Sequence, residues 1–231
     1  MAAHPQPLVG IGLYTVADAA KLLRESPRNI RRWLGGYWYE RDGQHHSIAP
    51  LWQPDLPSAD DHLELTFRDL IEVRFVKAFV DAGIGLKAVR NCLDYAKTFV
   101  ESDRPFSTGR FRTDGKTIFL ESLERSDEPK LLDLRKKQYA FKHVLEQSFK
   151  DLDLEDDAVT RWRPYKGKAS IVVDPERAFG QPIAADFGVP TIALAEAVAA
   201  EGSEAKVARL YEVSLAAVRD AVRFETGLQV A

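Results

Sequence analysis

Apolar residues recur at helical spacing in two short segments near the start of the chain. The first segment spans residues 15–23, where Thr15 is suited to cap a helix and apolar positions follow three or four residues apart. The second spans residues 26–34, where Ser26 is suited to the N-cap and Pro27 to the first helical position. Two short helices joined by a tight turn predict a helix-turn-helix.

The middle of the chain predicts further helices and one β-hairpin. Residues 67–79, 86–100 and 131–150 each place their apolar positions on one helical face. Before the last of these, residues 110–120 contain an Asp-Gly dipeptide with an alternating sequence on either side, which is a strong hairpin signal. We therefore expect a hairpin followed by an amphipathic helix in this region.

A reversal of charge marks the beginning of the last third of the chain. Residues 151–157 carry five carboxylates, whereas residues 158–168 carry four basic side chains and no acidic one. The acidic run is expected to be a solvated end or linker, so a domain boundary is expected here. Beyond it, residues 171–173 predict a strand, and residues 191–226 predict three short helices with a second helix-turn-helix outline.

Composition argues against several classes of protein. The formal net charge is −3, so any surface that attracts nucleic acid must be local. A single cysteine, Cys92, excludes an intramolecular disulfide and a cysteine-based zinc site. Neither a membrane-spanning apolar run nor a signal-peptide pattern is present, so a cytoplasmic location is expected. No nucleophile pattern or phosphate-binding loop occurs, so an enzyme is the least expected class, and we predict no catalytic residue, metal or cofactor.

The predicted helix-turn-helix is locally basic. Residues 21–41 hold six basic and two acidic side chains, a local charge of +4. Apolar positions of the second helix leave an arginine and asparagine cluster on its remaining surface. In the major groove, arginine can read guanine and asparagine can read adenine. A charged, solvated face is the alternative reading, but the agreement of helix spacing, caps and charge favours binding to nucleic acid.

Residues 13–100 resemble the MerR-type winged helix. The resemblance rests on LYTVADAAKLLRESPRNIRRWL and on TFRDLIEVRFVKAFVDAGIGLKAVR, which is similar to the segment after the wing in that family. It implies a recognition helix at about 26–34 and a wing at about 36–65, which is longer than the family's usual wing. The candidate DNA contacts are Arg24, Ser26, Arg28, Asn29, Arg31, Arg32, Tyr37, Tyr39, Arg41, His45 and Arg68.

Residues 171–225 resemble the domain-of-unknown-function family 433, which is common in antitoxins. Asp174-Pro175, Gly180 and Gly202 fall where that family has turns, but Phe187-Gly188-Val189 replaces its usual GTR. A MerR-like domain followed by this module is similar to long VapB-type antitoxins. The resemblance implies a PIN-type ribonuclease toxin that is neutralised by direct binding. It also implies repression of the protein's own operon by a homodimer or higher oligomer on double-stranded operator DNA.

Together these inferences predict a mainly α protein in three parts. Residues 1–104 are expected to form the MerR-like winged helix-turn-helix, and residues 105–157 a β-hairpin plus helical connector that could support dimerisation. Residues 158–231 are expected to form an antitoxin-type module with a small three-helix unit. Its basic first segment could occupy an acidic toxin active site, with a plain surface linker as the alternative. The candidate toxin contacts are Arg161, Trp162, Arg163, Tyr165, Lys166 and Lys168.

Two other functions remain open on the sequence. A ligand-responsive MerR-like regulator without a toxin would have a small-molecule pocket between the helices of residues 86–150. A protein-interaction adaptor would keep the helix-turn-helix but would not bind the DNA upstream of its own gene. The second helix-turn-helix, residues 203–226, has a charge of −1 when the adjacent Glu201 is included, which favours assembly or toxin contact there over DNA binding.

Overall fold

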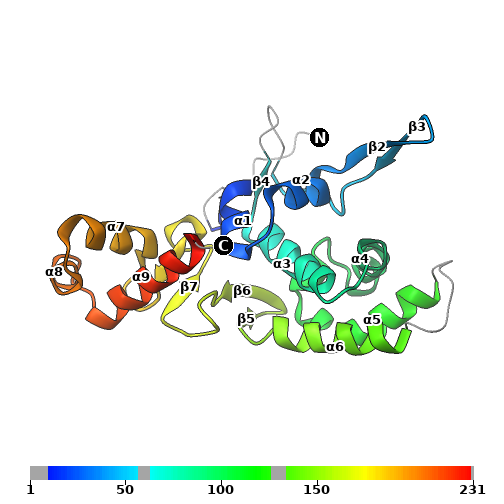
Figure 1. Ribbon diagram of the computed structural model, residues 1–231. Helices are drawn as coiled ribbons and strands as arrows, with labels where there is room; N and C mark the ends of the chain where they lie inside the picture. The colour runs from blue at the N-terminus through cyan, green and yellow to red at the C-terminus, as the bar shows by residue number, and fades with distance from the viewer. Residues whose placement is uncertain (1–9, 57–62, 126–133, 230–231) are drawn as a thin grey trace, which may run out of the picture.

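The computed structural model describes residues 10–56, 63–125 and 134–229. Its described residues are mainly helical, as the sequence predicts, with one five-stranded sheet and two small strand pairs. In Figure 1, the N-terminal helices and a long hairpin lie above a layer of helices, and a sheet leads from that layer to the C-terminal helices. None of the helices in the described ranges is both long and apolar enough to cross a lipid bilayer.

The two predicted N-terminal helices are confirmed. The first, α1 (Val16–Leu23), begins with a capping box in which the Thr15 hydroxyl accepts from the Asp18 amide and the Asp18 carboxylate accepts from the Thr15 amide. The second, α2 (Pro27–Gly35), begins at Ser26, whose hydroxyl oxygen accepts from the amide of Asn29. The short strand β1 (Tyr14–Thr15) before α1 pairs with β4 (Glu64–Leu65). Local capping and apolar spacing thus produce this part of the fold.

The predicted wing contains a regular antiparallel hairpin made of β2 (Tyr37–Arg41) and β3 (Gln44–Ile48). Its two-residue turn is Asp42-Gly43, and both residues have positive φ angles, 54° and 70°. Two consecutive positive φ angles are typical of a type I′ turn, whose twist matches that of the flanking strands. The hairpin projects away from the helices in Figure 1.

An aromatic core joins the central helices. These are α3 (Phe67–Asp81), α4 (Leu86–Val100), the short 3-10 helix η1 (Pro105–Ser107), α5 (Gly109–Glu124) and α6 (Leu134–Ser148). The Phe141 ring stacks between those of Phe79 and Phe119, at centroid distances of 4.5 and 4.0 Å. Aromatic rings packed in this way stabilise a core beyond their buried area. The core therefore fixes α6 against α3 and α5.

The hairpin predicted for residues 110–120 is wrong, because this segment lies within α5. The Thr108 hydroxyl caps the helix by accepting from the Phe111 amide. Phe111, Phe119 and the intervening Ile118 are fully buried, a spacing that suits a helix packed on one side. Gly115 lies on the same side, where an added Cβ would be 3.1 Å from Leu145 of α6. The glycine at position 115 is therefore explained by the close packing of α5 against α6, and not by a turn.

The acidic linker predicted for residues 151–157 is also wrong. This segment forms β5 (Leu152–Glu155) and a turn, and it pairs with β6 (Ala158–Trp162), so the hairpin crosses the boundary predicted between residues 157 and 158. Leu152 and Trp162 are buried in the same core as α3 and α6. Asp156 and Asp157 lie in the exposed turn, whereas Asp151, just before β5, pairs with Arg74, and Asp153 pairs with Arg163. The high charge is therefore accounted for by a turn and by ion pairs, without a linker.

The sheet continues into the C-terminal module. Its order is β5-β6-β7-β8-β9, all antiparallel, with β7 (Ile171–Val173), β8 (Pro182–Ala184) and β9 (Val189–Pro190). A 3-10 turn, η2 (Ala178–Gly180), lies between β7 and β8. The three predicted helices follow as α7 (Thr191–Glu201), α8 (Glu204–Leu210) and α9 (Leu215–Gln229), and they enclose a second hydrophobic cluster. Thr191 does not cap α7, because its buried hydroxyl donates to Glu225.

Candidate nucleic-acid interface

Helix α2 presents a basic surface because its apolar residues face inward. Ile30, Trp33 and Leu34 are buried, whereas Arg28 and Arg31 are exposed. Neither arginine forms a hydrogen bond or ion pair with any other residue that the structure describes. Two guanidinium groups near the start of a short helix are therefore free to contact an anion, and the partial positive charge of the helix N-terminus adds to their field.

Arg32 joins this helix to the hairpin. Its guanidinium carbon lies 3.9 Å from the centre of the Tyr37 ring, a cation–π contact. On the same side of the hairpin, Tyr39 stacks on His46 at a centroid distance of 5.1 Å. We call Arg32, Tyr37, Tyr39 and His46 the basic–aromatic face. It places positive charge, phenol groups and imidazole next to the free arginines of α2.

The opposite side of the hairpin carries a residue that the sequence reasoning missed. Trp38 is 71% exposed, and its ring meets His45 edge-on at a centroid distance of 5.7 Å. The sequence does contain a signal for this hairpin, because Asp42-Gly43 is a favoured hairpin turn and lies between two segments that form strands of equal length. Strand alternation then separates Trp38 from Tyr37 and Tyr39. Exposed Arg41, near the turn, forms an ion pair with Asp42 at 3.6 Å.

Three of the predicted DNA contacts face other parts of the protein. The Arg24 guanidinium donates to the carbonyl oxygen of Gly227 at the end of α9, 3.2 Å away, because the turn between α1 and α2 rests on that helix. The Asn29 amide nitrogen donates to Glu25 at 2.9 Å. Arg68 lies at the start of α3 and lines a separate cavity of about 530 Å³ next to the C-terminal sheet. Ser26 serves as the N-cap of α2.

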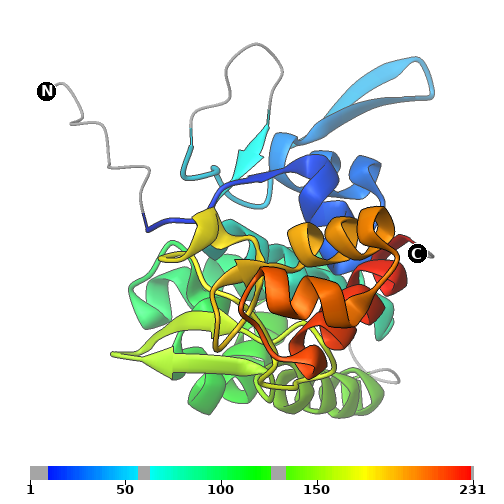
Figure 2. The ribbon, with the colours of Figure 1, turned by 90° about the vertical axis from the view of Figure 1, so that its left-hand side faces the viewer.

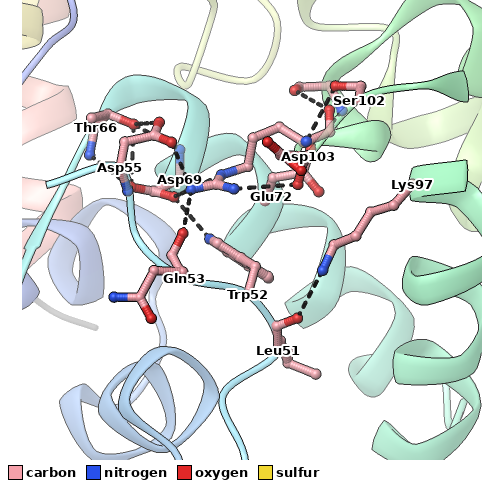
Figure 3. A network of polar contacts seen from close by, with 12 residues as sticks. Leu51, Trp52, Gln53, Asp55, Thr66, Asp69, Glu72, Lys97, Ser102 and Asp103 are labelled. Carbon is pink, nitrogen blue, oxygen red and sulfur yellow. Dashed lines mark hydrogen bonds and ion pairs between the residues drawn. The ribbon is translucent and has the colours of Figure 1, made fainter. Parts of the chain in front are cut away.

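The segment after the hairpin is held by cations of α4. This segment, residues 49–53, is called the strap below. Arg90 donates to the carbonyl oxygens of Pro50 and Ala49, at 2.8 and 2.7 Å. Lys97 donates to the carbonyl oxygen of Leu51 at 3.3 Å, a contact visible in Figure 3. The strap therefore fixes one end of the hairpin to α4.

A buried polar network fixes the other end of the strap. Asp69 of α3 is fully buried and accepts from Trp52 Nε1 and from Arg104 Nε, both at 2.8 Å. Arg104 also donates to the Gln53 carbonyl oxygen and to Asp55, again at 2.8 Å (Figure 3). Every contact in this group is charge-assisted or made to a charged group, which strengthens it in a dry interior. The network positions the hairpin relative to α2, since the strap also bonds to the last turn of α2.

Glu72 lies buried beside this network. One of its carboxylate oxygens accepts from the Ser107 amide at 2.9 Å, and the other has no hydrogen-bond partner among the residues that the structure describes. Burial raises the pKa of Glu72 from 4.5 to about 7, while its hydrogen bonds to Ser107 and the charge of Arg104 act in the opposite direction. Desolvation is the largest of these effects, so the protonated form is favoured at acidic and near-neutral pH.

The predicted toxin-contact segment is largely engaged within the fold. Trp162 is only 5% exposed and its indole donates to Asp151, so this candidate toxin contact is buried within the protein's own core. Arg161 and Arg163 form ion pairs with Asp174 and Asp153. Tyr165 packs edge-on against Phe224, and Lys168 lies 4.0 Å from Asp220. Lys166 is exposed and has no partner among the described residues.

A metal site is not formed by the described residues, which contain no group of three or more His, Cys, Asp or Glu side chains able to hold an ion. Of the two adjacent histidines, His45 packs beside Trp38 and His46 beside Tyr39. Strand alternation directs them to opposite sides of the hairpin.

Known proteins share this fold and parts of this sequence. Residues 171–224, from β7 into α9, match a family described as a protein of unknown function, DUF433. The chain is 28% identical over 226 residues to a protein of Mycobacterium tuberculosis (strain ATCC 25618 / H37Rv) named "Putative antitoxin VapB45", covering 92% of this chain and 93% of that protein. The crystal structure of Rv2018 from Mycobacterium tuberculosis matches with a TM-score of 0.72 and 25% identity, over 93% of this chain and 99% of that one. The chain is therefore similar over most of its length to a protein named as an antitoxin, and its C-terminal module is similar to DUF433.

Proposed function

We propose that this protein is a DNA-binding antitoxin whose helix α2 and β2–β3 hairpin bind double-stranded DNA. The observation that carries the DNA-binding part is the pair of free, exposed guanidinium groups of Arg28 and Arg31 beside the basic–aromatic face. In a protein of net charge −3, such a local cluster is suited to phosphates and base edges. Cations needed for internal ion pairs would not be left free in this way.

In this proposal the N-terminal unit works as a MerR-like winged helix. Helix α2 enters the major groove, where Arg28 and Arg31 contact base edges and phosphates. The hairpin acts as the wing, and Tyr39 and Arg41, which lie on one side of it, contact the sugar–phosphate backbone. The predicted contact His45 lies on the other side, beside Trp38. A homodimer or higher oligomer places two such units on a two-fold operator. We place this unit in residues 1–104.

The antitoxin part of the proposal is supported by similarity to the protein named VapB45 and to DUF433. We propose that the chain neutralises a PIN-type ribonuclease toxin by direct contact in the cytoplasm, represses its own operon and performs no catalysis itself. The proposed toxin-binding module begins near residue 158, with the β5–β6 hairpin shared with the preceding part. Among the basic residues of its first segment, the exposed Lys166 is the best placed to contact a partner.

Removing the two free arginines tests DNA binding. Arg28→Ala combined with Arg31→Ala is expected to weaken binding to the duplex upstream of the protein's own gene by about tenfold or more. It should also lower the slope of log affinity against log salt by about 0.9 for each lost phosphate contact. Fluorescence anisotropy over a salt series measures both quantities.

The matched control removes the same charge elsewhere. Arg110 and Arg112 are exposed on α5, so Arg110→Ala combined with Arg112→Ala should leave affinity and salt slope close to those of the unaltered protein. Equal loss of binding in the two double variants would show that only net charge matters. An unchanged affinity of the Arg28 and Arg31 variant would reject the proposed interface.

A further inference from the structure

A second basic surface lies where the C-terminal module meets the helix-turn-helix. A cavity of about 590 Å³ is open between α1, α9 and the segment that follows β6. Its lining contains three cationic side chains, from Arg24, Lys166 and Arg223, and no acidic one. Figure 2 shows the C-terminal helices, in orange and red, beside the blue helices of the N-terminal unit.

The rest of the lining is apolar and partly aromatic. Tyr165 and Phe224 meet edge-on at a centroid distance of 6.0 Å and an angle of 76°. They belong to a small apolar cluster that also contains Leu22 of α1 and Leu228 of α9. A cavity of this size, with apolar walls and a few converging polar groups, has the form of a small-molecule site.

The cations around the cavity are not neutralised by the fold. Arg223 and Lys166 are exposed and have no partner among the residues that the structure describes. Arg24 donates through one of its terminal nitrogens, Nη2, to Gly227, which leaves the other nitrogens of the guanidinium available. Two carboxylates of α9 are engaged elsewhere, Asp220 with Lys168 and Glu225 with Lys21.

The backbone also holds one of these cations in a defined place. Lys166 has a φ of 54°, a left-handed conformation that is uncommon for a residue other than glycine. Tight-turn hydrogen bonds from Gly167 to Arg163 and from Lys168 to Tyr165 enclose it, at 3.3 and 3.0 Å. A residue other than glycine keeps this conformation only where the surrounding structure enforces it. The fold therefore sets the backbone position from which the Lys166 side chain extends.

We propose that this cavity binds a small aromatic anion, with a phosphate or carboxylate group held by Arg223, Lys166 and Arg24. The aromatic body would lie against Tyr165 and Phe224. Charge-assisted hydrogen bonds from the cations supply affinity for the anionic group, and contact with the apolar wall supplies selectivity for a ring. A simple inorganic anion satisfies the first requirement but not the second.

Calorimetric titration of the full chain with phenyl phosphate tests the proposal. Inorganic phosphate and phenol, each of which carries only half of the recognised chemistry, are titrated in parallel. Phenyl phosphate is expected to bind at least fivefold more tightly than either. Equal affinity for phenyl phosphate and phosphate, or for phenyl phosphate and phenol, would overturn the proposal.

Variants locate the binding. Arg223→Ala and Lys166→Ala should each weaken phenyl phosphate binding by about tenfold or more, because each removes a hydrogen bond to a charged group. The matched control is Arg209→Ala, which removes an exposed arginine of α8 outside the cavity and should leave affinity unchanged. If all three variants bind phenyl phosphate alike, the cavity is not the site. None of these measurements involves DNA, so their outcome is independent of the proposed function.

Discussion

Side chains of the same residue type have different roles in this protein, and burial decides the role of each. Arg28 and Arg31 are exposed and unpaired within the described part of the chain, whereas Arg104 is buried and bonds to two carboxylates and two carbonyl groups. A buried guanidinium without such partners would be costly, so Arg104 and Asp69 depend on each other. Glu72, beside them, lacks a partner for one oxygen and is the least satisfied member of the group.

Glu72 should make the protein less stable as pH rises. Its folded-state pKa is about 7 and its ordinary value is 4.5, so between these pH values the unfolded chain ionises while the folded chain stays protonated. The penalty is absent below pH 4.5 and complete above pH 7, where it amounts to about 3 kcal/mol. Glu72→Gln should remove this dependence, and urea denaturation over this pH range measures it.

The control for Glu72 is Glu64→Gln, which removes an exposed carboxyl group on β4. The stability gained by Glu72→Gln over the unaltered protein should increase from pH 4.5 to pH 7 and then level off. If Glu72→Gln raises the stability by the same amount at every pH, the difference between the variant and the unaltered protein arises from packing and not from ionisation of Glu72.

At the scale of elements, the hairpin is held in place by contacts to the segment that follows it rather than by contacts of its own strands. Its strands contribute few buried side chains, and the strap after it is held by Arg90 and Lys97 of α4 and by Arg104. The strap also bonds to α2, because the Leu51 amide donates to the Trp33 carbonyl oxygen at 2.7 Å. The hairpin and α2 are therefore held in one arrangement by backbone contacts that side-chain patterns do not reveal.

Arg90→Gln should loosen the hairpin without unfolding the protein. It removes the charge-assisted bonds to Ala49 and Pro50, so amide hydrogen exchange in residues 37–48 should accelerate. Affinity for duplex DNA should fall several-fold because ordering the hairpin on DNA then costs more conformational entropy. Arg110→Gln on α5 is the matched control. Unchanged exchange in the hairpin would mean that the strap does not depend on Arg90.

At the scale of the whole molecule, the C-terminal module is joined to the helix-turn-helix through α1. Lys21 lies 3.6 Å from Glu225, Arg24 bonds to Gly227, and the buried Tyr14 hydroxyl donates to Gly180 at 2.7 Å. Burial raises the pKa of Tyr14, so this phenol stays protonated and remains a donor. The proposed toxin-binding module thus contacts α1 and β1, whereas the proposed DNA contacts lie on α2 and the hairpin.

Separate surfaces for DNA and toxin predict separable defects. Co-expression with the product of a neighbouring reading frame of PIN type should give a stable complex and restore growth. The Arg28→Ala and Arg31→Ala variant should restore growth equally well while failing to bind DNA, since toxin binding is assigned to the other end of the chain. Persistent toxicity with the unaltered protein, and no complex on size-exclusion chromatography, would reject the antitoxin proposal.

The two N-terminal helices, their caps and the C-terminal helices were predictable from sequence, because capping and apolar spacing act between residues a few positions apart. The sequence did not distinguish two Asp-Gly dipeptides. Asp42-Gly43 forms a hairpin turn, whereas Asp114-Gly115 lies in a helix whose glycine accommodates Leu145 of α6. Tertiary structure also decided that Arg24 contacts α9 and that Trp162 is buried. Those outcomes depend on packing partners from 30 to about 200 residues away, which local sequence patterns cannot encode.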